Sequence, residues 1–380
     1  MPTKVVLFAN TAWYLYNFRL SLARALVATG HEVLLISPPG EYGLRLRALG
    51  FRWIPISMVR RSLNPLVEIA LIWRLVRLFR REAPALVHGF TIKCAVYGAL
   101  AARLAGVAAR ISSVTGLGYV FTSDEPRARL LRVPLKWILR FALGGSGGRL
   151  IVQNTSDLQF FVEGGLASRE RTILIPGSGV DCSRFHPTTS DRRPGGLRVL
   201  LASRLLWDKG IGEYAQAAKA LTAAGSDIEF ILAGEPDPGN PASIAPHVLK
   251  AWSSSGALTC LGHVEDMVGL YADVDVVVLP SYREGLPKSL IEGAACGRAL
   301  IATDAPGCRD VVVHEHSGLL IPARQWRPIE AAIARLDDDR ALIGALGRAA
   351  RRRALELFDE KIILRETLAV YAGALASTGA

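Results

Sequence analysis

Residues Leu279–Gly297, LPSYREGLPKSLIEGAACG, give the strongest indication of the fold. The apolar run that leads into them, Val274–Leu279, predicts a buried strand. Pro287 and Gly297 delimit a helix, because proline favours the first helical position and glycine the residue after the last turn. A strand, a loop and a helix in this order predict an α/β protein with a parallel sheet.

Two carboxylates flank the predicted helix start. Backbone N–H groups at a helix start attract anions, and Gly285 lets a ligand approach the backbone closely. Glu284 lies just before this site, and Glu292 lies one to two turns into the helix, on the side away from Leu290. The spacing fits a sugar nucleotide held at both ends. A solvated glutamate in an ordinary α/β unit is the alternative.

The composition indicates a soluble protein of two domains. Half of the 380 residues are hydrophobic and about a fifth are charged, which supports large cores and argues against disorder. The five cysteines are scattered without a CxxC motif, so neither a disulfide framework nor a zinc site is expected, and a reducing cytoplasm is. The first residues show no signal peptide, and Arg103 breaks the best candidate for a membrane span of roughly 18 residues.

Positive charge is concentrated in the first half of the chain. Residues 1–190 hold 24 Lys and Arg against 10 Asp and Glu, whereas residues 191–380 hold 21 against 24. A membrane leaflet and nucleic acid are the candidate anionic partners, but no nucleic-acid module is present. The basic amphipathic stretches 60–82 and 127–143, the second with a central Trp137, favour docking on anionic lipid. Core-packing helices with a solvated basic face are the alternative.

The N-terminal half predicts a Rossmann-like sheet. Residues 4–10, 19–28 and 31–37 predict a strand, a helix and a strand. The turn that begins at Asn10, NTAWYLYNF, has no G-x-G-x-x-G, so a bound NAD is not expected. Its polar and aromatic residues fit a loop that lines the acceptor, with a packed surface loop as the alternative.

Further along, residues 150–154 predict another strand, and Thr155 or Ser156 is the expected cap of the helix after it. The Pro-, Gly- and Ser-rich residues 186–196 predict an interdomain linker, after which Arg198 begins a second strand–helix series.

The segment EGLPKSLIE followed by GAACGR closely resembles the E-x7-E motif of the family 4 glycosyltransferases, retaining enzymes of the GT-B fold. The resemblance implies that Glu284 contacts the donor sugar, that Glu292 binds the nucleotide ribose, and that the amides of Gly285 and Leu286 hold the diphosphate. It extends along nearly the whole chain and includes IPGSGVDCSRF at 175–185, where Ser178 replaces the usual Asn, and GLLIP at 318–322.

The same resemblance assigns the cations of the second half. RLLWDKG resembles the diphosphate-binding R-L-x-x-x-K-G, in which Arg204 and Lys209 stabilise the charge of the departing diphosphate. Gly234 and Glu235 end a strand that faces the cleft, and Val264 lies where the backbone meets the nucleobase.

In the first half, ALVH predicts a strand end that exposes His88. In the family this point faces the active site, often with two histidines spaced by one; here Phe90 replaces the second. His88, Thr91 and Lys93 are therefore all candidates for contact with the donor sugar, and Lys93 is also placed on the acceptor side. The segment SVTGLGYVFT, with acceptor-side glycines, resembles a subgroup that transfers N-acetylhexosamines to undecaprenyl-diphosphate-linked sugars; these glycines are Gly116 and Gly118.

The resemblance implies two facing Rossmann-like domains around a cleft: an N-terminal acceptor domain at 1–185, the linker 186–196, a donor domain at 197–358 and a returning helix at 359–380. It implies a retaining glycosyltransferase at the inner membrane face, with a UDP sugar as donor, an undecaprenyl-diphosphate-linked saccharide as acceptor and no cofactor. No metal is expected, because the D-x-D sequences at 273–275 and 337–339 do not present convergent carboxylates. A GT-B sugar-nucleotide epimerase, which needs no acceptor, is the alternative.

Overall fold

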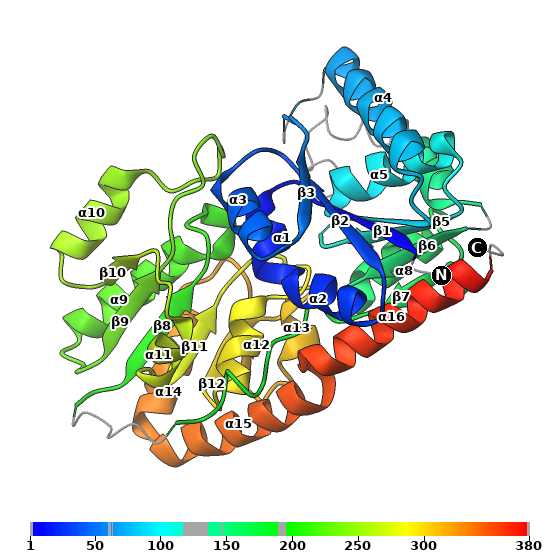
Figure 1. The fold of residues 1–380 in the computed structure, drawn as a ribbon. Helices are drawn as coiled ribbons and strands as arrows, with labels where there is room; N and C mark the ends of the chain where they lie inside the picture. Colours follow the sequence, from blue (N-terminus) through cyan, green and yellow to red (C-terminus); the bar gives the residue numbers. More distant parts are fainter. Residues whose placement is uncertain are drawn as a thin grey trace. The chain divides into compact units, whose positions relative to one another are not determined.

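The computed structural model describes residues 3–59, 62, 64–116, 136–145, 147–188 and 195–377. The chain divides into two units, each built on a parallel sheet (Figure 1). The first unit contains residues 1–178 and 362–380, and the second contains residues 179–361. The predicted α/β class with two Rossmann-like domains is therefore confirmed.

The divisions lie a few residues from the borders that the sequence predicts at 185 and 359. Val180 N donates to Phe358 O at 2.9 Å, and Glu360 N donates to Val180 O at 3.0 Å. These backbone bonds join the segment after residue 178 to the end of the second unit.

The first unit has a seven-stranded parallel sheet in the order β3-β2-β1-β4-β5-β6-β7. Its strands are β1 (Lys4–Phe8), β2 (Glu32–Ser37), β3 (Arg52–Pro55), β4 (Leu86–Phe90), β5 (Ala109–Val114), β6 (Gly148–Val152) and β7 (Thr172–Leu174).

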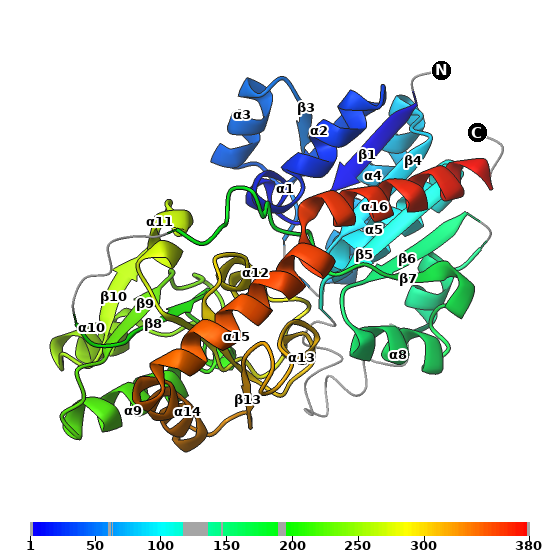
Figure 2. The ribbon, with the colours of Figure 1, turned by 90° about the horizontal axis from the view of Figure 1, so that it is seen from below.

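Helices cover both faces of this sheet. Apolar side chains of α1, α2 and α16 pack on one face, where α16 lies across the strands (Figure 2). Apolar side chains of α4 and α5 pack on the other face. The helices are α1 (Ala12–Phe18), α2 (Leu20–Ala28), α3 (Glu41–Ala48), α4 (Pro65–Glu82), α5 (Ile92–Ala105), α8 (Thr155–Glu163) and α16 (Glu360–Ala376), and residues 136–143 are also helical.

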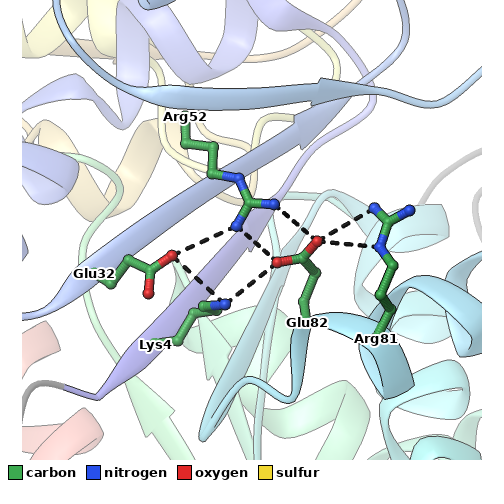
Figure 3. Close-up of polar contacts among 5 residues, drawn as sticks. All are labelled: Lys4, Glu32, Arg52, Arg81 and Glu82. Carbon is green, nitrogen blue, oxygen red and sulfur yellow. Dashed lines mark hydrogen bonds and ion pairs between the residues drawn. The ribbon is translucent and has the colours of Figure 1, made fainter.

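An ionic cluster anchors the end of α4 to the sheet (Figure 3). The buried Glu82 carboxylate accepts two bonds from Arg52 at 2.7 and 2.9 Å, and others from Lys4 and Arg81 at 3.3 and 3.2 Å. Arg52, together with Lys4, holds the pKa of Glu82 below its usual value, although burial opposes this. The basic helix α4 is therefore fixed at its C-terminal end.

The second unit has a six-stranded parallel sheet in the order β10-β9-β8-β11-β12-β13, with apolar clusters on both faces. Its strands are β8 (Arg198–Ala202), β9 (Glu229–Ala233), β10 (Thr259–Gly262), β11 (Val276–Leu279), β12 (Ala299–Thr303) and β13 (Leu319–Ile321). Its helices are α9 (Ile211–Ala223), α10 (Pro246–Ser254), α11 (Met267–Ala272), α12 (Lys288–Ala295), α13 (Cys308–Val311), α14 (Arg327–Asp338) and α15 (Arg340–Arg353).

Two local predictions are wrong. The segment after Asn10 is not a loop, because the Thr11 side chain accepts from Tyr14 N at 3.0 Å and caps α1. Neither Thr155 nor Ser156 caps α8, because Asn154 Oδ1 accepts from Asp157 N at 2.7 Å. The first error misses a whole helix, Ala12–Phe18, and the second places the cap of α8 one or two residues too late.

Candidate active site

In the second unit the strand order changes direction between β8 and β11, since β9 and β10 extend the sheet one way and β12 and β13 the other. Ligands of open parallel sheets bind outside the carboxyl ends of the strands at such a point. Arg204 and Lys209 follow β8, and Glu284 follows β11. The structure therefore places these three predicted catalytic residues at the edge where a ligand is expected.

Lys209 and Glu284 form an ion pair at this edge, with 2.6 Å between Nζ and Oε1. Their side chains are 11% and 15% exposed, so the pair is largely shielded from water while part of it remains accessible. A phosphate oxygen is an alternative partner for the ammonium group, and a sugar hydroxyl is one for the carboxylate. The pair can thus exchange its internal bond for bonds to a sugar diphosphate.

The backbone holds the two partners in place. Gly210 has a left-handed φ of 72°, and a Cβ on it would lie 2.1 Å from the carbonyl oxygen of Pro280. Tyr282 N donates to Asp208 O at 2.9 Å. The turn that carries Lys209 is therefore pressed against the loop that carries Glu284, which only glycine at position 210 allows.

Arg204 contacts a different carboxylate. Its Nη1 lies 3.0 Å from Oδ2 of Asp237, a residue that follows β9, the neighbour of β8 in the sheet. Asp237 was not among the site residues predicted from the sequence. The sequence feature that could have indicated Asp237 is its position just beyond Gly234, at the end of a predicted strand, because parallel sheets place functional side chains there.

Glu292 is buried on α12, where its Oε2 accepts from the Tyr271 hydroxyl at 3.2 Å and its Oε1 lies 3.6 Å from Lys288 Nζ. Burial raises the pKa of Glu292 above its usual value, although Lys288 acts in the opposite direction. The carboxylate is held ready for a hydrogen-bond donor such as a ribose hydroxyl. Tyr271, which orients it, was not identified from the sequence because a core tyrosine carries no motif.

The predicted helix start is confirmed: Pro287 is the N-cap of α12, and Gly285 and Leu286 precede it. Gly234 has a φ of 138°, and a Cβ on it would lie 1.8 Å from Ser203 O, so a close backbone approach explains this glycine. The carbonyl of Glu235 accepts from Leu205 N at 2.9 Å. Val264 is half-buried against the core of the second unit. The donor-binding roles of these residues stay predictions.

In the first unit, the prediction that His88 is exposed is wrong. The ring is only 1% exposed, with Nδ1 2.5 Å from the Tyr371 hydroxyl and Nε2 2.7 Å from Ser113 Oγ. Burial lowers the pKa of His88 well below its usual value, and the charge of Arg19 adds to this. The strand end is covered by α16, which carries Tyr371 and lies far away in the sequence, so that the β4 pattern alone could not reveal it.

Lys93 is also engaged within the first unit. Its ammonium group donates to Glu68 Oε1 at 2.8 Å and to Val59 O at 2.7 Å. Thr91 has a φ of 68°, which is strained for a β-branched residue, and it precedes α5. A Cβ on Gly116 would meet nothing within 4 Å, and Gly118 lies outside the described residues.

A cavity of about 280 Å³ lies at the carboxyl ends of β1 and β2. The residues that line it include Asn10, the half-exposed Trp13, Glu41 and Tyr42. The structure thus places Asn10 beside aromatic and hydrogen-bonding groups, a combination that suits a saccharide.

The D-x-D sequence at 273–275 has partners within the protein. Arg198 forms an ion pair with Asp273, and its backbone N donates to the Asp275 carboxylate at 3.0 Å. Across the part of the chain that the structure describes, no three His, Cys, Asp or Glu side chains gather as a metal site.

Family models identify the class of protein. The model described as glycosyl transferases group 1 matches residues 196–339, and that described as glycosyl transferase 4-like matches residues 4–147. The first match covers all six strands of the second sheet with Arg204, Lys209, Glu284 and Glu292, and the second match covers strands β1 to β5 of the first sheet. The chain is therefore a glycosyltransferase and belongs to family 4, as the sequence predicts.

Two curated glycosyltransferases are similar to this chain over most of its length. The chain is 29% identical to the N,N'-diacetylbacillosaminyl-diphospho-undecaprenol alpha-1,3-N-acetylgalactosaminyltransferase of Campylobacter jejuni, over 94% of this chain and 95% of the relative. It is 25% identical to the UDP-Gal:alpha-D-GlcNAc-diphosphoundecaprenol alpha-1,3-galactosyltransferase of Escherichia coli, over 74% of each chain. Both names describe transfer to a saccharide linked to undecaprenol through diphosphate.

Solved structures confirm the GT-B fold. A glycosyltransferase from Rickettsia africae superposes with a TM-score of 0.79 at 16% identity, over 98% of this chain and 99% of the other. Alr3699/HepE from Anabaena, in complex with UDP, gives 0.77 at 18% identity, over 97% and 100%. Among the described residues, every helix is too short or too polar to cross a membrane.

Proposed function

We propose that this glycosyltransferase moves a hexose or N-acetylhexosamine from a UDP sugar to an undecaprenyl-diphosphate-linked saccharide, with retention of anomeric configuration, in the assembly of a bacterial surface polysaccharide. The observation that carries the proposal is the Lys209–Glu284 pair at the direction change of the second sheet. The two named relatives support the lipid-linked acceptor.

The donor half of the reaction follows from the charges. Departure of the nucleoside diphosphate builds up negative charge, which the preorganised cations Arg204 and Lys209 stabilise without a metal or other cofactor. Glu284 orients the sugar, and Glu292 binds the ribose. The departing diphosphate takes the proton of the acceptor hydroxyl as the new glycosidic bond forms on the same face of the sugar.

The cavity beside Asn10 is the proposed site of the acceptor saccharide. Trp13 offers an apolar ring face, and the Glu41 carboxylate and the Asn10 amide offer hydrogen bonds to hydroxyl groups. Because the lipid tail of this acceptor stays in the bilayer, the first unit has to approach the membrane.

An exposed surface of the first unit suits this approach. Arg80 of α4 donates to Leu104 O at 3.2 Å, and Arg103 donates to Phe141 O at 2.7 Å, so α4, the end of α5 and residues 136–143 adjoin. Exposed apolar and basic side chains on these three segments fit docking on an anionic cytoplasmic leaflet. We call this set the α4 surface: Leu66, Val67, Ile69, Trp73, Arg74, Arg77, Leu104, Trp137, Ile138 and Phe141.

Release of UDP from a panel of UDP sugars, measured with EDTA and with or without an undecaprenyl-diphosphate-linked saccharide, tests the transfer. We expect release from one donor only when the lipid-linked acceptor is present. An epimerized sugar nucleotide formed without acceptor would instead establish the epimerase, and no release from any pair would contradict the proposed donor or acceptor class.

Sedimentation with vesicles tests the membrane surface. We expect the chain to pellet with anionic but not zwitterionic vesicles, less so at high salt, and the double variant Arg74→Glu/Arg77→Glu to stay in the supernatant. Arg24→Glu, at an exposed position of α2, is the matched control. Equal binding by the double variant would contradict the role of the α4 surface, and retention on DNA would favour a nucleic acid as its partner.

A further inference from the structure

The loop between β9 and α10 has an ordered internal structure around Asp237. Oδ2 of Asp237 accepts from Arg204 Nη1 at 3.0 Å and from Asn240 Nδ2 at 3.1 Å, while Asp237 N donates to Ser243 Oγ at 3.0 Å. The Asp237 side chain is 12% exposed, against 55% for Arg204. The Asp237 carboxylate is thus largely buried and held by hydrogen bonds, and it contacts the more exposed guanidinium of Arg204.

This loop is also bonded to the turn that carries the cations. Trp207 N donates to Ala242 O at 2.8 Å, and Ile244 N donates to Leu205 O at 2.9 Å. The side chain of Asn240 accepts from Ala242 N at 3.1 Å and so holds the loop in the conformation that these bonds require. Hydrogen bonds between backbone groups therefore join residues 204–207 to residues 237–244.

We propose that Asp237 is a positioning residue, which holds the Arg204 guanidinium where the diphosphate of the donor binds. This rests on the proposed function, in which Arg204 contacts that diphosphate. A free arginine side chain samples many rotamers, and ordering it when the ligand binds weakens the affinity. The bond to Asp237 restricts the Arg204 side chain before the donor binds, so less ordering remains to be done on binding.

The geometry leaves Arg204 available for its ligand. A guanidinium has five N–H donors in a planar fork, and Asp237 engages it through Nη1. The remaining edge can donate to phosphate oxygens while the Asp237 bond persists. If Asp237 instead competed with the diphosphate for Arg204, its removal would strengthen UDP binding. The positioning role predicts the opposite, that removal of Asp237 weakens UDP binding.

Calorimetric titration with UDP and with uridine tests the proposal on the wild-type chain, Asp237→Ala, Arg204→Ala and the double variant. We expect about 10-fold weaker UDP binding in each single variant and no further loss in the double variant, because Asp237 acts through Arg204. Uridine, which has no phosphate, should bind all four chains equally. Asp237→Asn, which keeps an acceptor oxygen, should recover part of the loss, and Asp338→Ala on α14 is the surface control.

The outcomes separate this proposal from the proposed function. Tighter or unchanged UDP binding by Asp237→Ala, losses that multiply in the double variant, or an equal loss of uridine binding would overturn the positioning role alone, provided that the wild-type chain transfers sugar. A wild-type chain that binds no UDP would overturn the proposed donor class and, with it, the role of Arg204. Normal folding of each variant is checked by circular dichroism.

Discussion

In both sheets the strand order changes direction at one point, but the side chains at these two points differ in exposure and charge. In the first unit the point lies between β1 and β4, where His88 is 1% exposed and bonded through both ring nitrogens. In the second unit it lies between β8 and β11, where Lys209 and Glu284 remain partly exposed and bond to each other. The first edge therefore contains a buried histidine with a lowered pKa, and the second contains a charged pair that is partly accessible to solvent.

This difference shows where the chemistry is concentrated. A partly accessible ion pair can exchange its internal bond for charge-assisted bonds to a ligand, whereas a buried histidine with two hydrogen bonds must lose packing before it reaches a substrate. We therefore expect substitutions of Lys209 and Glu284 to affect turnover and substitution of His88 to affect mainly stability.

The largest effect is expected for the ion pair of the second unit. Lys209→Ala or Glu284→Ala should each lower turnover at least about 100-fold, the scale for loss of a preorganised charge partner. UDP release in the presence of the lipid-linked acceptor measures this. Lys219→Ala, at an exposed position of α9, is the matched control. Near-normal turnover in either variant would remove the pair from the active site.

A smaller effect on function, with a gain in stability, is expected for Glu292→Gln. Burial raises the pKa of Glu292 in the folded state above its ordinary value of 4.5, so the stability contributed by the protonated form is lost as the pH rises through the folded pKa. Glutamine mimics the protonated form. The variant should melt at a higher temperature than wild type at pH 8 and show no such advantage near pH 4.

The same variant should bind UDP about 10-fold more weakly, because a hydrogen bond from ribose to a charged acceptor is replaced by a neutral one. Asp338→Asn serves as the surface control for both measurements. Unchanged melting at pH 8 would contradict a destabilising cost of burying the Glu292 carboxylate, and unchanged UDP affinity would contradict its contact with the ribose.

The sequence allows the second edge to be predicted further than the first. Glu284, Lys209 and the α12 start are all local: each lies in a short motif at the end of one strand, and a parallel sheet brings such ends together without further information. The fold class follows from the same strand–helix alternation. Asp237 and Tyr271 could not be predicted in this way, because each contacts a site residue that belongs to another element.

At the first edge, the decisive neighbours of His88 lie in distant segments. Tyr371 comes from α16, 283 residues along the chain, and Ser113 from β5, 25 residues along. The pattern around β4 predicts the strand but contains no information on what covers its end. Lys93 is similar, because its partner Glu68 lies on a different helix, α4, and the sequence around Lys93 does not indicate this contact.

Lys93→Met tests whether that lysine is structural. Removal of the ammonium group leaves the buried Glu68 carboxylate without its 2.8 Å partner, which should lower the free energy of unfolding by about 1–3 kcal/mol. Urea unfolding measures this, with Arg24→Met as the control. A stable variant with greatly reduced turnover would instead support the predicted contact of Lys93 with a substrate.

The smallest effect is expected at His88 and appears as a pH dependence. Burial, with the charge of Arg19, lowers the pKa of His88 in the folded state below its ordinary value of 6.5. The unfolded chain then binds a proton that the folded chain rejects, so stability present above pH 6.5 is lost as the pH falls towards the folded pKa. His88→Gln cannot titrate, and it should be less stable than wild type at pH 8 but lose less stability on acidification.

Hydrogen exchange of the β4 amides between pH 8 and pH 5, corrected for the intrinsic rates, follows this locally in the first unit. His247→Gln, at an exposed position of α10, is the control and should show the wild-type pH dependence of β4. An identical pH dependence in His88→Gln would show that the buried ring does not set it. A loss of turnover in His88→Gln with β4 protection unchanged would return the histidine to the list of groups that contact the donor sugar, and the contrast between the two edges would then no longer hold.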